Sequence, residues 1–151
     1  MEVVIKEFND LNLEELWEIY AVRGRVFIVE QGIVYEDPDN YDKISTHIYY
    51  RENGIMIAYL RVIPIDEKNC KIGRVISLKR GCGIGSDIMR VAIKYCEDKG
   101  YEKIKISSQS YIKSMYEKLG FVQISEEYTI LNVLHVDMEL EINKKEHIPI
   151  N

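Results

Sequence analysis

The stretch Arg80-Gly81-Cys82-Gly83-Ile84-Gly85 lies between an apolar segment and an amphipathic one, and it is the most informative part of this chain. Its three glycines alternate with other residues, so a ligand can approach the backbone closely. The segment that follows has helical periodicity, and the free N–H groups at the start of such a helix point into the loop. The sequence therefore predicts an anion-binding site, most simply one for phosphate.

A cationic run surrounds this loop, although the protein as a whole is acidic. The net charge is −5, yet residues 68–86 contain no carboxylate and five cations: Lys68, Lys71, Arg74, Lys79 and Arg80. This local charge supports an anion site, and the alternative interpretation is a solvated basic strand edge. The negative net charge argues against general nucleic-acid binding.

Length and composition predict one ordinary globular domain. The chain has 151 residues, 46% of them hydrophobic and 30% charged, and we expect a single domain over residues 1–142 with a polar tail at 143–151. No apolar stretch approaches the ~20 residues of a membrane span, and the N-terminus does not resemble a signal peptide. We therefore expect a cytoplasmic protein without membrane contact. Its three cysteines have no metal-ligand spacing and are expected as reduced thiols.

Hydrophobic periodicity and turn signals predict the element order β-α-β-β-β-α-β-α-β-β. Asn12 and Glu15 indicate the start of the first helix, which should break near Gly24 and continue as a buried segment over residues 26–29. Asn53-Gly54 indicates a hairpin. Strands are expected at residues 3–8, 46–51, 55–65, 71–78, 103–107, 121–125 and 133–141, and further helices at 86–99 and 111–119. The fold class is α+β, a mixed α/β sandwich in which an antiparallel meander leads into a βαβ unit.

Two common phosphate-binding motifs do not match the glycine loop. A P-loop requires a lysine beside its last glycine, and none is present here. A dinucleotide fingerprint requires a third glycine where this chain has Ser86, and an acidic residue at the end of the next strand. That strand ends in Ser107-Ser108-Gln109 instead.

Three stretches in order resemble the GNAT family of acetyl-CoA-dependent N-acetyltransferases. They are the glycine loop, the helix and strand after it, and Tyr116-Glu117-Lys118-Leu119-Gly120-Phe121. Residues 23–31, the acidic loop at 35–42 and His47 further resemble the ElaA-like branch. The resemblance covers about residues 15–140 and implies a GNAT-like fold, with a twisted, mostly antiparallel central sheet and a βαβ coenzyme A site. The chain departs from the family pattern at Ser77 and from the branch pattern at residues 132–134.

The resemblance implies acetyl-CoA as cosubstrate and a set of residues that bind it. Arg80 and the backbone N–H groups of Gly81, Cys82, Gly83, Ile84, Gly85 and Ser86 would hold the pyrophosphate. Val75, Ile76 and Ser77 would pair with the pantetheine as an added strand would, and one of their N–H groups would face the developing oxyanion. No metal is expected, because the acidic loop lacks the ligand spacing of a calcium site.

By the same resemblance Tyr116 is the general acid for the coenzyme A thiolate. Proton transfer from a tyrosine to such a thiolate is uphill by about 1.5 pKa units, so a strong hydrogen bond to the sulfur is the more realistic role. The alternative is that Tyr116 only fills an apolar helix face. Because an amine is mostly protonated at neutral pH, a base is useful, and the candidates are Glu30, His47 and His135. Burial after the first helix would make Glu30 a better base.

The acidic loop suggests an amine-binding role, in which Asp37 and Asp39 attract a cationic substrate, with His47 and His135 as further substrate residues. The leading function is an N-acetyltransferase that moves an acetyl group to a primary amine of a small molecule or peptide by direct attack, without an acetyl-enzyme intermediate. The alternatives are a non-catalytic acyl-CoA-binding module or sensor, and a polyamine- or protein-binding partner that uses only the acidic loop. Exposed strand edges and 11 tyrosines are compatible with a homodimer.

Overall fold

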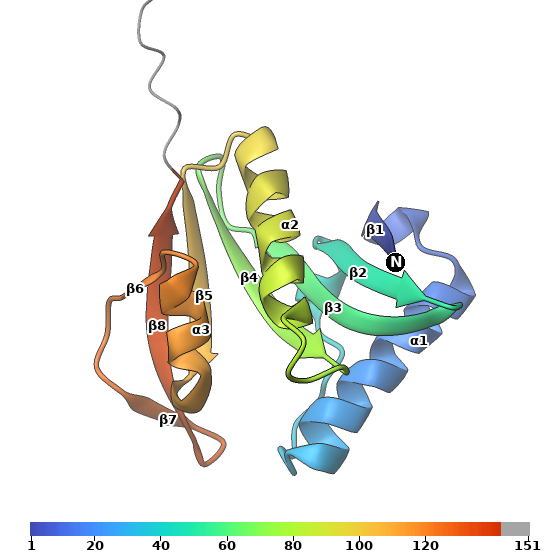
Figure 1. The fold of residues 1–151 in the computed structure, drawn as a ribbon, viewed down its shortest axis with the longest axis horizontal. Helices are drawn as coiled ribbons and strands as arrows, with labels where there is room; N and C mark the ends of the chain where they lie inside the picture. Colours follow the sequence, from blue (N-terminus) through green and yellow to red (C-terminus); the bar gives the residue numbers. More distant parts are fainter. Residues whose placement is uncertain (143–151) are drawn as a thin grey trace, which may run out of the picture.

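The computed structural model describes residues 1–142, in which a strongly twisted eight-stranded sheet carries helices on both faces (Figure 1). The strand order is β1-β2-β3-β4-β5-β8-β6, and β7 pairs with β8. The strands are β1 (Glu2–Glu7), β2 (Thr46–Glu52), β3 (Ile55–Pro64), β4 (Asn69–Ser77), β5 (Lys103–Gln109), β6 (Val122–Gln123), β7 (Tyr128–Ile130) and β8 (Val133–Glu141). The helices are α1 (Leu13–Arg23), α2 (Ile84–Asp98) and α3 (Lys113–Lys118), with shorter turns η1 (Phe8–Asp10), η2 (Gly24–Glu30), η3 (Asn40–Lys43) and η4 (Ser110–Ile112).

This architecture confirms the predicted α+β class and nearly all of the predicted element order. Asn53 and Gly54 both have positive φ, as the predicted hairpin turn between β2 and β3 requires. Two details differ near the C-terminus: β6 has two residues rather than five, and the three-residue strand β7 was not predicted. So short a strand carries too little alternation to be read from sequence. The tail predicted at 143–151 lies outside the described residues.

Helix α1 begins as the sequence predicts. The Asn12 side chain accepts from the Glu15 N–H at 2.8 Å, and the Glu15 carboxylate accepts from the Asn12 N–H at 3.0 Å. The end differs from the prediction, because the chain does not leave the helix at Gly24 but widens into the π-helical turn η2. The wider winding changes which side chains face the sheet. Val26 is buried, whereas Ile28 and Val29 are 38% and 78% exposed.

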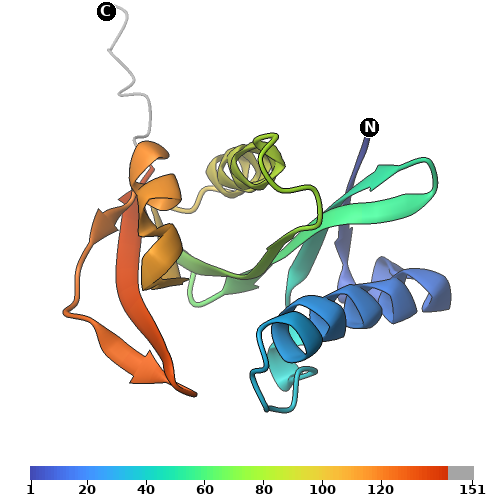
Figure 2. The ribbon, with the colours of Figure 1, turned by 60° about the horizontal axis from the view of Figure 1, so that its bottom comes forward.

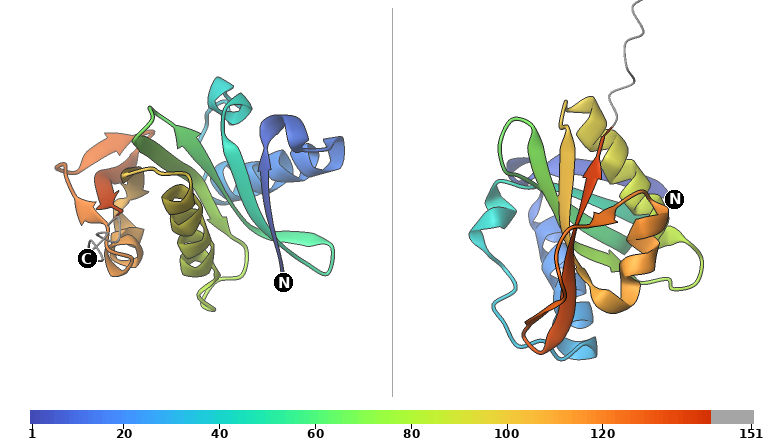
Figure 3. Two further views of the ribbon diagram at one scale, coloured as in Figure 1. Left: turned by 90° about the horizontal axis from the view of Figure 1, so that it is seen from above. Right: turned by 90° about the vertical axis from the view of Figure 1, so that its left-hand side faces the viewer.

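The two faces of the sheet carry separate hydrophobic cores. Helices α2 and α3 cover one face, and α1 covers the other (Figures 2 and 3). The α2 face packs Ile88, Met89 and Ala92 of the helix against strands from β2 to β8. The α1 face packs Ile19 and Val22 against residues of β2, β3 and β4. Within residues 1–142, no helix has the length and apolar character to cross a bilayer.

The parallel pairing of β4 with β5 covers the beginnings of the two strands. It consists of Asn69↔Lys103, Cys70↔Ile104 and Lys71↔Lys105. Beyond Lys71 the two strands diverge, as Figure 1 shows for their lower ends. From Ile72 to Ser77 the side of β4 that faces β5 therefore has no strand pairing within the described chain. This opening is the structural feature on which the candidate site is built.

Candidate active site

A β-bulge in β4 lies beside the opening. Tyr59 pairs with Ile76 and Arg61 with Gly73, so one residue of β3 is opposite both Arg74 and Val75. Arg74 has φ 54°, which is unusual for a residue with a side chain. The bulge bends the strand and directs the residues after it. Val75 packs on the α2 side and Ile76 on the α1 side, so the backbone edge between them faces the opening.

Ion pairs hold the bulge in place. Nε of Arg74 lies 3.2 Å from Oδ1 of Asp37, and Nη2 of Arg74 donates to the Asp37 carbonyl at 3.2 Å. The Arg74 guanidinium lies 5.1 Å from the centre of the Tyr35 ring. The loop between α1 and β2 is thereby fastened to the strand that the resemblance assigns to the thioester. Strained backbone of this kind persists where its surroundings fix it, and it is common at functional sites.

The glycine loop follows β4 directly and leads into α2. Gly81 and Gly83 have φ 81° and 77°, conformations that favour glycine. Gly83 is the N-cap residue of α2, and no side chain caps the helix. The Ser77 and Cys82 side chains donate to the Lys79 carbonyl at 3.0 and 3.3 Å, which tightens the turn before the helix. The loop thus presents bare backbone at a helix N-terminus, the arrangement that suits an anion.

Arg80 is available to an anion but already has a partner. Its Nη2 lies 3.1 Å from Oε2 of Glu30, and the two side chains are 73% and 44% exposed. Exposed pairs of this kind are weak. The desolvated surroundings expected for Glu30 are therefore absent, because this carboxylate lies at the surface on the end of η2. It connects η2 to the glycine loop.

Tyr116 lies on α3, close to the glycine loop: the Sδ atom of the preceding residue, Met115, is 3.5 Å from the position that a Cβ at Gly85 would take. Tyr116 is 4% exposed, packs edge-on against Phe121 with ring centroids 5.9 Å apart, and belongs to the core under α2. No residue within 1–142 forms a hydrogen bond with its hydroxyl. The hydroxyl of a buried tyrosine usually has a hydrogen-bond partner. Because this hydroxyl has none among the described residues, it can bond to a ligand. Burial raises the pKa of Tyr116 above its ordinary value.

The acidic loop is structurally committed to three arginines. Arg23 is fully buried and its Nη1 lies 2.6 Å from Oδ1 of Asp42, while Nε lies 2.9 Å from Oδ2 of Asp37. Arg61 binds Asp39 through both of its terminal nitrogens, at 2.6 and 2.9 Å, and also reaches Asp42 at 2.8 Å. With Arg74, three cations neutralise three carboxylates. Asp37 and Asp39 therefore have intramolecular partners, and the amine-binding role expected for them stays a prediction.

His47 is also part of this buried network. It is completely buried, its Nδ1 lies 2.6 Å from the Tyr59 hydroxyl and its Nε2 lies 2.9 Å from the Asp42 carbonyl. Both ring nitrogens are thus occupied, and burial lowers the pKa of His47. Sequence reasoning singled out the aspartates and missed Arg23, Arg61 and Arg74 as their partners. The sequence offers no local signal for this pairing, because the three arginines lie on α1, β3 and β4, outside the loop that carries the aspartates.

His135 differs from His47 in that only one of its ring nitrogens has a hydrogen-bond partner among residues 1–142. It lies half-buried on β8, and its Nδ1 is 2.8 Å from the Val133 carbonyl. Because a carbonyl can only accept, Nδ1 carries the proton and donates, which leaves the lone pair of Nε2 available. The ring stacks on Tyr128, with centroids 6.0 Å apart. Gln109, which is opposite His135 in the sheet, donates to the Gln31 side chain at 3.0 Å, so the end of η2 reaches this part of β5.

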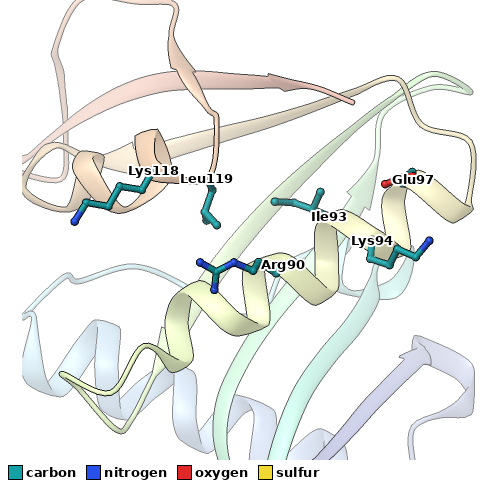
Figure 4. Close-up of a pocket in the computed structure, with 6 residues that line it drawn as sticks. All are labelled: Arg90, Ile93, Lys94, Glu97, Lys118 and Leu119. Atoms are coloured by element: carbon teal, nitrogen blue, oxygen red, sulfur yellow. The ribbon is translucent and has the colours of Figure 1, made fainter. Parts of the chain in front are cut away.

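A separate shallow groove of about 370 Å³ runs between α2 and α3 (Figure 4). Its lining consists of Arg90, Ile93, Lys94, Glu97, Lys118 and Leu119. None of these residues belongs to the glycine loop or to β4. The groove carries the charges of Arg90, Lys94 and Lys118 between the two helices that cover the same face of the sheet. Within residues 1–142 no group of three or more His, Cys, Asp or Glu side chains is arranged to hold a metal ion.

Comparisons with known proteins agree with this geometry. A family model described as an acetyltransferase (GNAT) domain matches residues 28–142. The chain belongs to the GNAT acetyltransferase family. Among its relatives, a UPF0039 protein of Schizosaccharomyces pombe is 35% identical, over 94% of this chain and 98% of that protein.

Solved structures of GNAT proteins superpose on almost the whole chain. An acyl-CoA N-acyltransferase of Pseudomonas aeruginosa is 30% identical with a TM-score of 0.86, over 91% of this chain and 97% of that one. Escherichia coli ElaA is 26% identical with a TM-score of 0.88, over 93% of this chain and 100% of that one. The expected GNAT fold and the relation to ElaA are thus confirmed for this GNAT protein.

Proposed function

We propose that this protein transfers the acetyl group of acetyl-CoA to a primary amine of a small molecule or peptide by direct attack. The observation that carries the proposal is the unpaired edge of β4, which runs directly into the glycine loop at the N-terminus of α2. An edge of this kind accepts an extended chain containing amides, and the loop accepts a phosphate group. Coenzyme A has both parts in that order. The family match supports the same cosubstrate.

The chain's own residues divide the binding work between backbone and side chains. The N–H groups of Gly81 to Ser86 would hold the pyrophosphate, with Arg80 turning to it from its weak pair with Glu30. Val75, Ile76 and Ser77 would pair with the pantetheine arm, and an N–H after the bulge would face the acyl oxygen. Bound acetyl-CoA supplies a thioester whose carbonyl carbon takes the amine while the sulfur leaves as a thiolate.

Tyr116 would stabilise the departing sulfur. Its hydroxyl has no partner among the described residues, and its buried ring is held by Phe121. The raised pKa of Tyr116 keeps the phenol protonated over the pH range in which an amine loses its proton. It also makes complete proton transfer costly, so a hydrogen bond to the sulfur is the proposed contribution.

His135 is the proposed proton acceptor for the amine. Of the three candidates from the sequence, Glu30 is exposed and paired with Arg80, and His47 has both nitrogens occupied. His135 keeps a free Nε2 on the strand that adjoins β5. Histidine is the side chain that most often accepts or donates a proton in such transfers.

Two measurements test this proposal. Calorimetry with acetyl-CoA should show binding, and release of the coenzyme A thiol should depend on an added primary amine. Tyr116→Phe should lower kcat by about 10- to 100-fold, the value of one hydrogen bond to a charged group, and should leave acetyl-CoA affinity unchanged. Tyr111→Phe is the matched control, because Tyr111 is 72% exposed on the preceding turn.

The outcomes separate the alternatives. Binding of acetyl-CoA without acetylation of any amine would favour a non-catalytic acyl-CoA-binding module. Absence of acetyl-CoA binding would contradict the proposal entirely. Equal rates for Tyr116→Phe and the wild type would remove Tyr116 from the mechanism.

A further inference from the structure

Asp137 lies at the point where β4 and β5 separate. It is opposite Ser107 in the pairing of β8 with β5, and Ser107 is two residues beyond Lys105, where the pairing with β4 ends. Its neighbours Val136 and Met138 are buried in the core under α2. Because side chains alternate along a strand, Asp137 faces the opposite side of the sheet, toward α1. Its carboxylate is therefore placed beside the opening.

This carboxylate has an unusual set of partners. Oδ1 accepts from the Tyr128 hydroxyl and, at 3.2 Å, from the Ser107 hydroxyl, so every partner is neutral. No cation within residues 1–142 pairs with Asp137, and Oδ2 has no hydrogen-bond partner there. The other carboxylates around the opening are paired: Asp37, Asp39 and Asp42 with arginines, Glu30 with Arg80, and Glu139 with two lysines.

An uncompensated, half-buried carboxylate attracts a cation. Two hydroxyl donors orient the Asp137 carboxylate, and both bind Oδ1, so Oδ2 stays open. Hydrogen bonds with an ionised donor or acceptor are about twice as strong as those between neutral groups. The group that suits Oδ2 is thus a cationic N–H donor, which describes a protonated amine.

The face around Asp137 also indicates what carries the amine. In the β7–β8 hairpin Tyr128 is opposite His135, and Ile130 is opposite Val133. By strand alternation these four side chains share the face of Asp137. Two stacked rings and two aliphatic side chains therefore extend from the carboxylate toward the hairpin turn, with Ile130 42% exposed.

We infer that Asp137, oriented by Tyr128 and Ser107, binds the acceptor amine, and that the acceptor is a primary amine on an aliphatic or arylalkyl chain. This inference rests on the proposed function, because it places the amine beside the opening that would hold the thioester. His135, one step along the same strand face, lies between the carboxylate and the apolar residues. Binding and proton acceptance would then come from neighbouring positions of β8.

The test uses the full chain with acetyl-CoA and 2-phenylethylamine as the probe amine. Asp137→Asn should raise the amine KM about 10-fold, the loss of one charged hydrogen bond, and leave the acetyl-CoA KM unchanged. Glu139→Gln is the matched control: it removes a carboxylate from the same face of β8, two residues farther from the opening, and should change the amine KM less than twofold. Tyr128→Phe should retain the preference for the cation, because the charge of Asp137 remains.

A binding measurement makes the test independent of turnover and of the folding of Asp137→Asn. Wild-type protein saturated with coenzyme A should bind 2-phenylethylamine about 10-fold more tightly than 2-phenylethanol, which has the same shape without the charge. Equal binding of the two, an unchanged amine KM in Asp137→Asn, or an equal loss in Glu139→Gln would each overturn the inference. If the amine binds with this preference but is not acetylated, the proposed function fails while the amine site stands.

Discussion

Arg74 concentrates backbone strain and ionic contacts in one residue. Its φ of 54° is a conformation that costs an L-residue about 1–2 kcal/mol, and its guanidinium contacts Asp37, Asp39 and the Tyr35 ring. The ion pairs oppose the strain and keep the bulge in β4 where the acyl oxygen would lie. A glycine at this position would adopt the same positive φ without strain. It would have no side chain to fasten the loop of residues 32–39 to the strand.

Two substitutions at this residue separate the effect of the backbone strain from the effect of the side-chain contacts. Arg74→Ala removes the contacts and keeps a side chain at positive φ, whereas Arg74→Gly removes the contacts and the strain together. The alanine variant should unfold at lower urea concentration than the glycine variant, by about 1–2 kcal/mol in the free energy of unfolding. Both should lose activity with acetyl-CoA. If the alanine variant were as stable as the glycine variant, the positive φ would carry no strain.

Among the elements, η2 and the glycine loop use glycine for different reasons. Gly24 lies where α1 passes into η2, with helical φ and ψ of −61° and −43° and with no atom within 4 Å of an added Cβ. Gly83 also has open space around an added Cβ, but its φ of 77° is left-handed. The two positions thus differ in backbone conformation and not in room.

The same substitution should therefore have opposite effects at the two positions. Gly24→Ala should stabilise the protein by about 0.5–1 kcal/mol, because alanine loses less entropy in a helix. Gly83→Ala should destabilise it by about 1–2 kcal/mol and weaken acetyl-CoA binding. Urea unfolding gives the stabilities, and calorimetry gives the affinity. Stabilisation by Gly83→Ala would show that the loop does not need its left-handed residue.

Elements with strong local signals were predictable, and those set by tertiary contacts were not. The Asn12 cap, the Asn53-Gly54 turn and the periodicity of α2 each depend on neighbouring residues, and the structure confirms them. The π-helical winding of η2 and the pairing of β7 depend on packing across the sheet. Because Arg23 and Asp42 meet only when α1 and the following loop pack on β3, spacing in the sequence gave no sign of their contact. The roles of Tyr116 and His135 remain predictions.

At the scale of the whole molecule, the buried charge network should control stability in acid. Burial by itself would raise the pKa of Asp42, but the hydrogen bonds and the charge of Arg23 outweigh burial and lower this pKa. Burial would likewise raise the pKa of Asp39, and the hydrogen bonds and charge of Arg61 lower it instead. A lowered carboxyl pKa contributes stability that is complete above the unfolded pKa of about 3.9 and is lost as pH falls through the folded value. His47, whose pKa burial lowers, loses its contribution as pH falls below its unfolded value of about 6.5.

The free energy of unfolding should therefore decrease in two ranges, first below pH ~6.5 and again below pH ~4. Asp42→Asn should destabilise the protein by about 3–5 kcal/mol at pH 7, because it leaves buried arginines without a full partner. Asp42→Asn should also make the free energy of unfolding fall less steeply below pH ~4. Asp98→Asn, which breaks an exposed pair with Lys94, should change neither quantity. Urea titrations between pH 3 and 8 measure both, and a flat profile would contradict the role of the network.

The parting of β4 from β5 has a further consequence for the engineering of this fold. Three residue pairs connect the ladder of β1–β4 to that of β5–β8, and α2 packs against both. Beyond these three pairs, no strand pairing links β4 to β5 within the described residues. Insertions or deletions in the β7–β8 hairpin can lengthen or reshape one wall of the opening without shifting a residue in the other. The wall formed by this hairpin can therefore be engineered independently of the wall formed by β4 and the glycine loop.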